Sequence, residues 1–212
     1  MTDFETRSSE RVFDGVVASV RIDRVEMPGG GVASREVVEH DRAAAVVALD
    51  DAGQVVLIEQ YRHPLGHRLW ELPAGLMDID GEDAFATAKR ELAEETGLTA
   101  TDWEVLVDVA VSPGFTTEAV RVFLARGLAD VGRQGEIAHE EADLRVVRVP
   151  LAEAVDAVLA GRIVNASAVA GLLAADLLVR TGGTGRPADD PWTAGPAVVS
   201  PDAPDLTPDP HW

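Results

Sequence analysis

The residues of this chain best suited to chemistry are three glutamates in one short segment. Glu91, Glu94 and Glu95 lie within RELAEETGL, residues 90–98. Side chains three or four positions apart are neighbours on a helix surface, so the three carboxylates would share one region and repel one another. Clustered carboxylates on a rigid helix can bind Mg²⁺ or Mn²⁺, which prefer oxygen ligands. The segment predicts either a metal site or a solvated acidic face.

The position of these glutamates favours the metal site. We expect a helix over residues 83–96, and the glutamates fall in its last turn. There the helix dipole disfavours negative charge, typically by about 0.3–1 kcal/mol for each carboxylate. Arg90 lies about 100° around the helix from Glu91 and could hold a neighbouring carboxylate in one rotamer. Since the acidic cluster occupies the less stable end of the helix, it indicates a function. The expected core-facing stripe is Phe85, Ala88 and Leu92.

The residues around this helix form a longer pattern at fixed spacing. Its members are Gly75, Glu82, Arg90, Glu91, Leu92, Glu94, Glu95, Gly97 and Leu98. The pattern resembles the Nudix box, GX5EX7REUXEEXGU, in which U is an aliphatic residue. The chain departs from the box by one extra residue between Gly75 and Glu82, in the loop before the helix. The spacing of the helical arginine and glutamates is unchanged.

Resemblance to the Nudix family implies a mixed α/β fold, α+β with a mixed sheet, arranged as an α/β/α sandwich. It also implies metal-dependent hydrolysis of a nucleoside diphosphate linked to another group. Mg²⁺ is the expected cofactor, with Mn²⁺ as the alternative ion. Carried over to this chain, Glu91 and Glu95 would be the main metal ligands. Glu94 would be a ligand or a supporting acid, and Arg90 would orient the carboxylates.

Three further segments resemble the ADP-ribose pyrophosphatase branch of the family. In RLWELPAGLMD, residues 68–78, the resemblance implies that the Ala74 carbonyl also ligates a metal. In SPGFTTE, residues 112–118, Pro113 stands near the place of the proline that marks substrate preference in this branch. The segment GRIVNASAVAGLLAA, residues 161–175, is similar to actinobacterial members.

The same resemblance implies two arginine contacts to substrate. Arg35 and Arg62 occupy the segments REVVEH and QYRH, whose arginines would contact the diphosphate and the adenosine end. Guanidinium groups suit phosphate oxygens because they present several donors in one plane. Taken alone, either arginine could be a strand residue in a surface ion pair, and Pro113 could simply form a turn.

A charged segment, GEIAHEEADLR, covers residues 135–145 and precedes an expected strand. In the ADP-ribose branch, a mobile loop at this place supplies a catalytic glutamate. The match to HEEAD makes Glu141 the first choice for a base that activates water, and Glu140 the alternative. A solvated acidic loop is the non-catalytic interpretation of the same residues.

The function implied by these resemblances is Mg²⁺-dependent cleavage of ADP-ribose to AMP and ribose 5-phosphate. A first alternative is a Nudix pyrophosphatase that acts on another nucleoside diphosphate derivative, such as a nucleotide sugar or a dinucleotide. A second is a module that binds ADP-ribose without cleaving it. Such modules typically lose glutamates of the box, whereas this chain keeps all four.

Composition restricts the partners and the location. The formal net charge is −19, with no basic stripe visible, so nucleic acid and anionic membranes are not expected partners. The chain has no cysteine, no apolar run long enough to span a membrane and no visible secretory signal. We therefore expect a cytoplasmic protein that acts on a small molecule.

Around the helix we expect a mixed sheet with helices on its faces. The expected strands are 16–26 and 32–39, 43–50 and 54–62 (each pair a hairpin), then 103–111, 119–127 and 144–150. Two more helices are expected at 151–160 and 165–179. The predicted organisation is an N-terminal strand region (1–40), a Nudix hydrolase domain (41–180) and a Pro-rich tail (181–212). The resemblance also implies a homodimer whose N-terminal strands pack across subunits.

Overall fold

The computed structural model describes residues 4–133 and 144–192 of the 212-residue chain. Its helices are α1 (Ala84–Thr96), α2 (Leu151–Leu159) and α3 (Ala166–Thr181), with a short 3-10 helix η1 (His63–Leu65). The longer strands are β1 (Thr6–Asp14), β2 (Ala18–Glu26), β3 (Val32–His40), β4 (Ala43–Ala48), β5 (Gln54–Arg62), β6 (His67–Glu71), β9 (Asp102–Ala110), β10 (Ala119–Arg126) and β12 (Arg145–Pro150). The short strands are β7 (Ala74–Leu76), β8 (Leu98–Thr99), β11 (Ala129–Asp130) and β13 (Arg186–Pro187). None of the described helices is long and apolar enough to cross a membrane.

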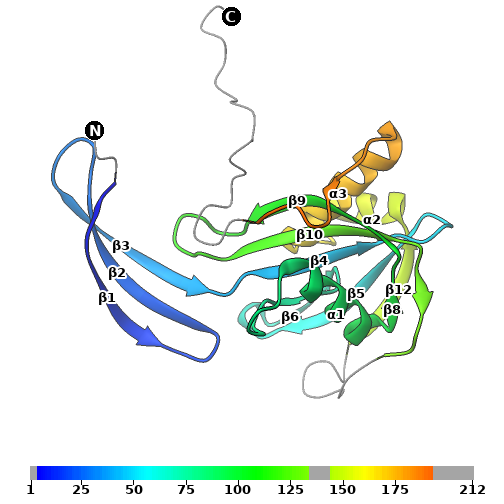
Figure 1. Cartoon of the computed structure of the whole chain (residues 1–212), viewed down its shortest axis with the longest axis horizontal. Coiled ribbons are helices and arrows are strands. Elements are labelled where there is room, and N and C mark those ends of the chain that lie inside the picture. The colour runs from blue at the N-terminus through cyan, green and yellow to red at the C-terminus, as the bar shows by residue number, and fades with distance from the viewer. Residues whose placement is uncertain (1–3, 134–143, 193–212) are drawn as a thin grey trace, which may run out of the picture.

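A five-stranded mixed sheet lies at the centre of the body (Figure 1). Its strand order is β13-β9-β10-β4-β7, in which β10 and β4 run parallel and the other neighbours antiparallel. Side chains of β4 alternate between two apolar cores: Val46 faces one and Val47 the other. Helix α1 closes the first core, whereas α2, α3 and the sheet β12-β5-β6 close the second. The predicted mixed α/β fold is confirmed.

The expected hairpin between residues 43–50 and 54–62 is wrong. A turn at Asp50–Gly53 does join β4 to β5, with the Asp50 side chain accepting from the backbone of Ala52 and Gln54. The two strands then enter different sheets, because β10 and β7 already occupy both edges of β4. They meet only at one bridge, Leu49 to Val55, while β5 pairs with β6 and β12.

The other expected helices and strands are confirmed to within two residues. The sequence did not predict β1, β6 or β7. β1 is exposed along its whole length and has no apolar alternation that would reveal it. β7 has only three residues, and its pairing with β4 supplies the order that its own sequence does not specify.

The N-terminal sheet, in the order β1-β2-β3, extends away from the body (Figure 1). It joins the body at the end of β3, where Val38 and Phe115 share a backbone hydrogen bond and His40 N–H donates to Thr117 Oγ1 at 3.0 Å. Within the sheet, Arg21 pairs with Asp23 and Glu39. The division of the chain at residues 40 and 180 stays a prediction.

Part of the predicted tail is ordered against the body. Helix α3 ends at Gly182, whose φ of 64° allows the left-handed cap. The chain then adds β13 to the edge of β9 and continues to Trp192, which packs against the α1 core. Trp192 thus docks on the body of its own chain. Trp212 lies outside the described residues.

Candidate active site

Helix α1 presents two of its glutamates to the interior. The Asp83 side chain caps its first turn by accepting from Ala86 N–H at 2.8 Å, and Gly97 ends it in a left-handed conformation. Ala88 and Leu92 are fully buried and fix the orientation of the helix against the sheet. Glu91 and Glu95 are only 9% and 4% exposed. A solvated acidic face is therefore wrong for these two residues.

Strand β7 lies beside these glutamates, and its backbone contacts both carboxylates. Ala74 N–H donates to Glu95 Oε2 at 2.8 Å. The Glu91 carboxylate lies over Gly75, where a Cβ atom would come within 2.0 Å of Oε1. Pairing of β7 with β4 sets this dipeptide beneath α1. Glu91, Glu95 and the Ala74–Gly75 backbone thus lie together, and their role as metal ligands stays a prediction.

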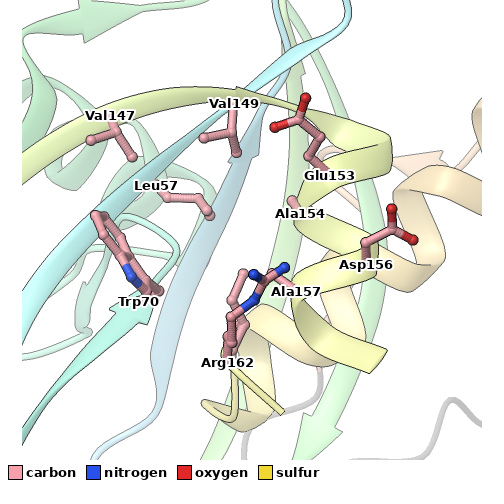
Figure 2. A pocket seen from close by; sticks show the side chains of 10 residues that line it. Leu57, Trp70, Val147, Val149, Glu153, Ala154, Asp156, Ala157 and Arg162 are labelled. Carbon is pink, nitrogen blue, oxygen red and sulfur yellow. The ribbon is translucent and has the colours of Figure 1, made fainter. Parts of the chain in front are cut away.

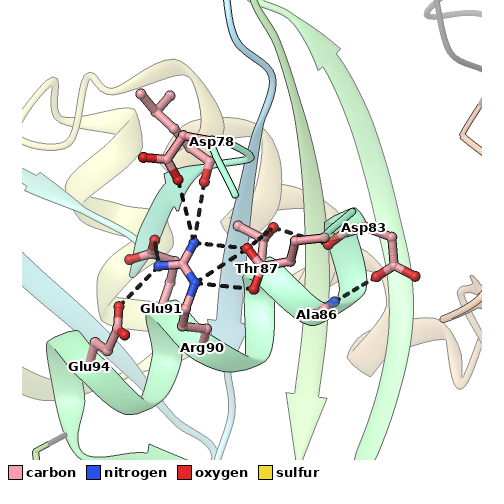
Figure 3. Close-up of polar contacts among 9 residues, drawn as sticks. Asp78, Asp83, Ala86, Thr87, Arg90, Glu91 and Glu94 are labelled. Atoms are coloured by element: carbon pink, nitrogen blue, oxygen red, sulfur yellow. Dashed lines mark hydrogen bonds and ion pairs between the residues drawn. The ribbon is translucent and has the colours of Figure 1, made fainter. Parts of the chain in front are cut away.

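Arg90 links the remaining acids of the box (Figure 3). Its guanidinium donates to Glu82 Oε2 at 3.0 Å, to Glu91 Oε1 at 2.6 Å and to Glu94 Oε2 at 3.0 Å. The Glu82 hydrogen bond is the main cause that raises the pKa of Arg90 above its usual value. Arg90 therefore bonds to three carboxylates of the box, and its orienting role stays a prediction.

The extra residue of the box is absorbed before the helix. A turn from Ile79 to Glu82, with Gly81 at φ 82°, leads into the N-cap. Glu82 then reaches both Arg90 and the Thr87 hydroxyl, which donates to it at 2.9 Å. The insertion thus leaves Glu82 inside the same network of hydrogen bonds.

Replacing Glu82 by Gln should make the protein less stable at neutral pH but not in acid. The hydrogen bond from Arg90 lowers the pKa of Glu82. A carboxyl with a lowered folded pKa stabilises the fold above its unfolded pKa of about 4.3 and loses that contribution as pH falls through the folded pKa. We expect Glu82→Gln to lower the free energy of unfolding by about 1 kcal/mol at pH 7.

Urea unfolding of wild type and Glu82→Gln between pH 7 and pH 3.5 measures this difference. It should shrink as pH falls below about 4.3. Asp51→Asn, at an exposed position of the turn before β5, is the control and should leave stability unchanged at both ends of the range. A difference of the same size at pH 3.5 and pH 7 would contradict the role of the Glu82 charge.

The donor chemistry of this site suits a hard divalent cation. Three carboxylates, of Glu82, Glu91 and Glu94, bond to the one guanidinium of Arg90, and the Glu95 carboxylate lies on Ala74 N–H, so every candidate ligand is an oxygen atom. In the described part of the chain, no three acidic or histidine side chains are already placed together to hold a metal ion. Arg90 instead bonds to Glu91 and Glu94. The excess of buried negative charge is what a bound cation would neutralise.

Two adjoining cavities lie beside the glutamates. The larger, of about 540 Å³, is lined by Ala74, Gly75 and Arg62. The second, of about 390 Å³, is lined by Arg35 and Pro113, and Glu118 borders both. The predicted substrate residues Arg62, Arg35 and Pro113 thus line two neighbouring cavities, together called the hollow, and the candidate ligand Ala74 lines the larger one.

The Arg62 side chain is held rigidly in this hollow. Its guanidinium makes two parallel hydrogen bonds to Glu71, at 2.9 and 2.6 Å, and Glu71 is 2% exposed. Such a bidentate pair fixes both the position and the plane of the guanidinium. Arg35 lies on the N-terminal sheet and is exposed, with its Nη1 donating to Ser34 O.

Sequence reasoning missed Glu71, Glu118 and Arg42 as residues of this hollow. Glu71 could have been found, since it is the one charge in the apolar run LWELP. Arg42 and Glu118 carry no comparable local signal. Glu140 and Glu141, the candidate bases, lie outside the described residues.

A separate cavity of about 360 Å³ lies between β5, β6, β12 and α2 (Figure 2). Trp70, Leu57 and Val147 line one side, and Ala154 and Ala157 of α2 line the other. None of the described residues predicted to bind metal or substrate lines it. Trp70 packs against the second core.

Comparison with known proteins agrees with this geometry. The model of the NUDIX domain matches residues 38–170. The ADP-ribose pyrophosphatase of Mycobacterium tuberculosis is 52% identical over 198 residues, which cover 93% of this chain and 95% of that protein. The ADP-ribose pyrophosphatase of Bacillus subtilis is 38% identical over 71% of this chain and 80% of its own length. A solved structure described as an ADP compounds hydrolase superposes with a TM-score of 0.74 at 22% identity, covering 86% of this chain and 97% of that one.

Proposed function

The chain belongs to the NUDIX family, and on that premise we propose that it hydrolyses ADP-ribose to AMP and ribose 5-phosphate. The observation that carries this proposal is the pair Glu91 and Glu95, buried against Ala74–Gly75 at the end of a hollow lined by arginines. Two relatives named ADP-ribose pyrophosphatase, at 52% and 38% identity, support the choice of substrate.

Nudix hydrolases generally use divalent metal ions, and we propose Mg²⁺ here, with Mn²⁺ as the alternative. Glu91, Glu95 and the Ala74 carbonyl would hold the ions, with Glu94 as a further ligand or a supporting acid. The chemistry that a bound divalent cation supplies is neutralisation of charge on the diphosphate and polarisation of its phosphate oxygens. Arg90 keeps the carboxylates in place by its hydrogen bonds to Glu91 and Glu94.

The remaining residues of the hollow bind and orient the substrate in this proposal. Arg62 would contact the diphosphate, since Glu71 holds its guanidinium in a fixed plane. Arg35 and Pro113 would contact the adenosine end from the adjoining cavity. Glu141 would accept the proton of the attacking water, with Glu140 as the alternative.

We also propose that the protein is a cytoplasmic homodimer. The N-terminal sheet supports the dimer, because β1 is exposed along its length and Phe13, Val16 and Val17 expose apolar surface. Packing of this sheet on a second subunit would bury these residues and place Arg35 near the interface. Sedimentation equilibrium measures the assembly, and a monomer at micromolar concentration would contradict it.

A substrate panel separates this function from its alternatives. ADP-ribose should give the highest kcat/KM among ADP-ribose, GDP-mannose and NAD, each tested with Mg²⁺. Dominant turnover of GDP-mannose or NAD would replace the proposed substrate. Tight binding of ADP-ribose without hydrolysis, with both Mg²⁺ and Mn²⁺ present in turn, would instead favour a binding module.

Gly75→Ala should reduce activity far more than stability. The new Cβ would lie 2.0 Å from Glu91 Oε1, so the carboxylate must move. A displacement of about 1 Å at a catalytic site can cost roughly 10²-fold in rate, and we expect a loss of that order in kcat/KM. Gly29→Ala is the matched control, because a Cβ there meets nothing within 4 Å. Equal activity of the two variants would show that the position of Glu91 over Gly75 is not required.

A further inference from the structure

The C-terminal segment reaches the wall of the substrate hollow through one aromatic ring. The Trp192 ring contacts two guanidinium groups, with Arg42 Cζ at 4.8 Å and Arg121 Cζ at 5.0 Å from its centroid. Arg42 lines the cavity that also contains Arg35 and Pro113. It also lines a smaller cavity of about 230 Å³ beneath Trp192. Arg42 therefore stands between the C-terminal segment and the proposed substrate.

Arg121, the second of these arginines, is held by bonds of its own. Arg121 is 2% exposed and makes two hydrogen bonds to Asp108, at 2.7 and 3.1 Å. Its guanidinium also donates to the backbone carbonyl of Asp190. Arg186 ties the segment down from β13 by bonding to Asp108 at 2.7 Å and to Asp190 at 2.6 Å. These charge-assisted bonds fix Arg121 without any help from the indole ring.

The Trp192 ring itself is held through its faces. Its buried Nε1 has no hydrogen-bond partner in the described part of the chain. Stacking on guanidinium groups and packing against the α1 core therefore set its position. Loss of the ring would remove the stacking contact of the Arg42 guanidinium.

We propose that Trp192 is a positioning residue that holds the Arg42 guanidinium in the substrate hollow, and that Arg42 binds the nucleoside monophosphate half of the substrate. This inference rests on the proposed function, because it takes a nucleoside diphosphate derivative as the ligand. The placement of Arg42 beside Arg35 and Pro113, rather than beside Arg62, selects the nucleoside half. A guanidinium suits both phosphate oxygens and the face of a base.

Calorimetric binding of AMP and of ribose 5-phosphate, with Mg²⁺ present, tests the proposal. Arg42→Met should weaken AMP binding about tenfold, the loss expected for one charge-assisted contact. Binding of ribose 5-phosphate should be unchanged.

The Trp192 variants test the positioning role. Trp192→Leu should weaken AMP binding severalfold, and the double variant with Arg42→Met should bind AMP no more weakly than Arg42→Met alone. Trp192→Phe keeps an aromatic face and should restore most of the affinity. Arg180→Met, at an exposed arginine of α3, is the control and should bind AMP normally.

Each alternative result has a distinct meaning. Additive losses in the double variant would overturn the positioning role of Trp192, and unchanged AMP binding in Arg42→Met would overturn the role of Arg42. If Trp192→Leu unfolds at a much lower temperature than wild type, Trp192→Phe and its double variant with Arg42→Met still measure the coupling between the two residues in AMP binding. The proposed function is tested separately: it fails if the wild-type protein does not hydrolyse ADP-ribose.

Discussion

Glu95→Gln should remove nearly all Mg²⁺-dependent turnover of ADP-ribose while leaving the fold intact. Glutamine has the same size as glutamate and can still accept the hydrogen bond from Ala74 N–H, which is 2.8 Å from the carboxylate. It lacks the charge that would hold a cation at a position only 4% exposed. Metal catalysis contributes several kcal/mol, and each ~1.4 kcal/mol is tenfold, so we expect a loss of roughly 10²–10³-fold in kcat/KM.

Steady-state kinetics across a Mg²⁺ titration check this prediction, together with a thermal melt of each variant. Glu94→Gln is an informative companion, because the Glu94 side chain is 33% exposed and bonds to Arg90 rather than to β7. We expect its loss to be smaller, about tenfold. Asp51→Asn, in the turn before β5, controls for the loss of an exposed acid. If Glu95→Gln kept most of its turnover, the assignment of metal ligands would be wrong.

The second large effect concerns the base. Glu141→Gln should lower kcat by roughly 10²–10⁴-fold, the usual contribution of a positioned general base, and should change KM little. The acid limb of the pH–rate profile should disappear with it, because that limb reports protonation of the base. Glu140→Gln should remain within severalfold of wild type in the same assay.

The two variants form a matched pair, since both replace neighbouring glutamates of the segment HEEAD. A large loss in Glu140→Gln with a small one in Glu141→Gln would assign the base to Glu140. Small losses in both, with an intact acid limb, would show that the base lies outside this segment.

Much of the site could be predicted because its chemistry is local in sequence. Glu91, Glu94, Glu95 and Arg90 lie on one helix, so their spacing alone fixes their relative placement. What brings Ala74 and Gly75 beneath that helix is the pairing of β7 with β4, which no three-residue strand can specify by itself. The resemblance to a family supplied that link, and the residues did not.

The errors come from contacts between segments distant in sequence. β4 and β5 are short apolar runs joined by a tight turn, and their pattern suits a hairpin as well as two sheets. The edges of β4 are taken by β10 and β7, a fact that the turn does not encode. Arg42 was missed for the same reason, because Trp192, which it contacts, is far away along the chain.

Analysis of the products formed from ADP-ribose and Mg²⁺ tests the central claim most directly. Ion-exchange chromatography of the reaction should show AMP and ribose 5-phosphate in equal amounts, with no product when the metal is removed by EDTA. Unchanged ADP-ribose after prolonged incubation with either Mg²⁺ or Mn²⁺, or the same turnover in the presence of EDTA, would contradict the account.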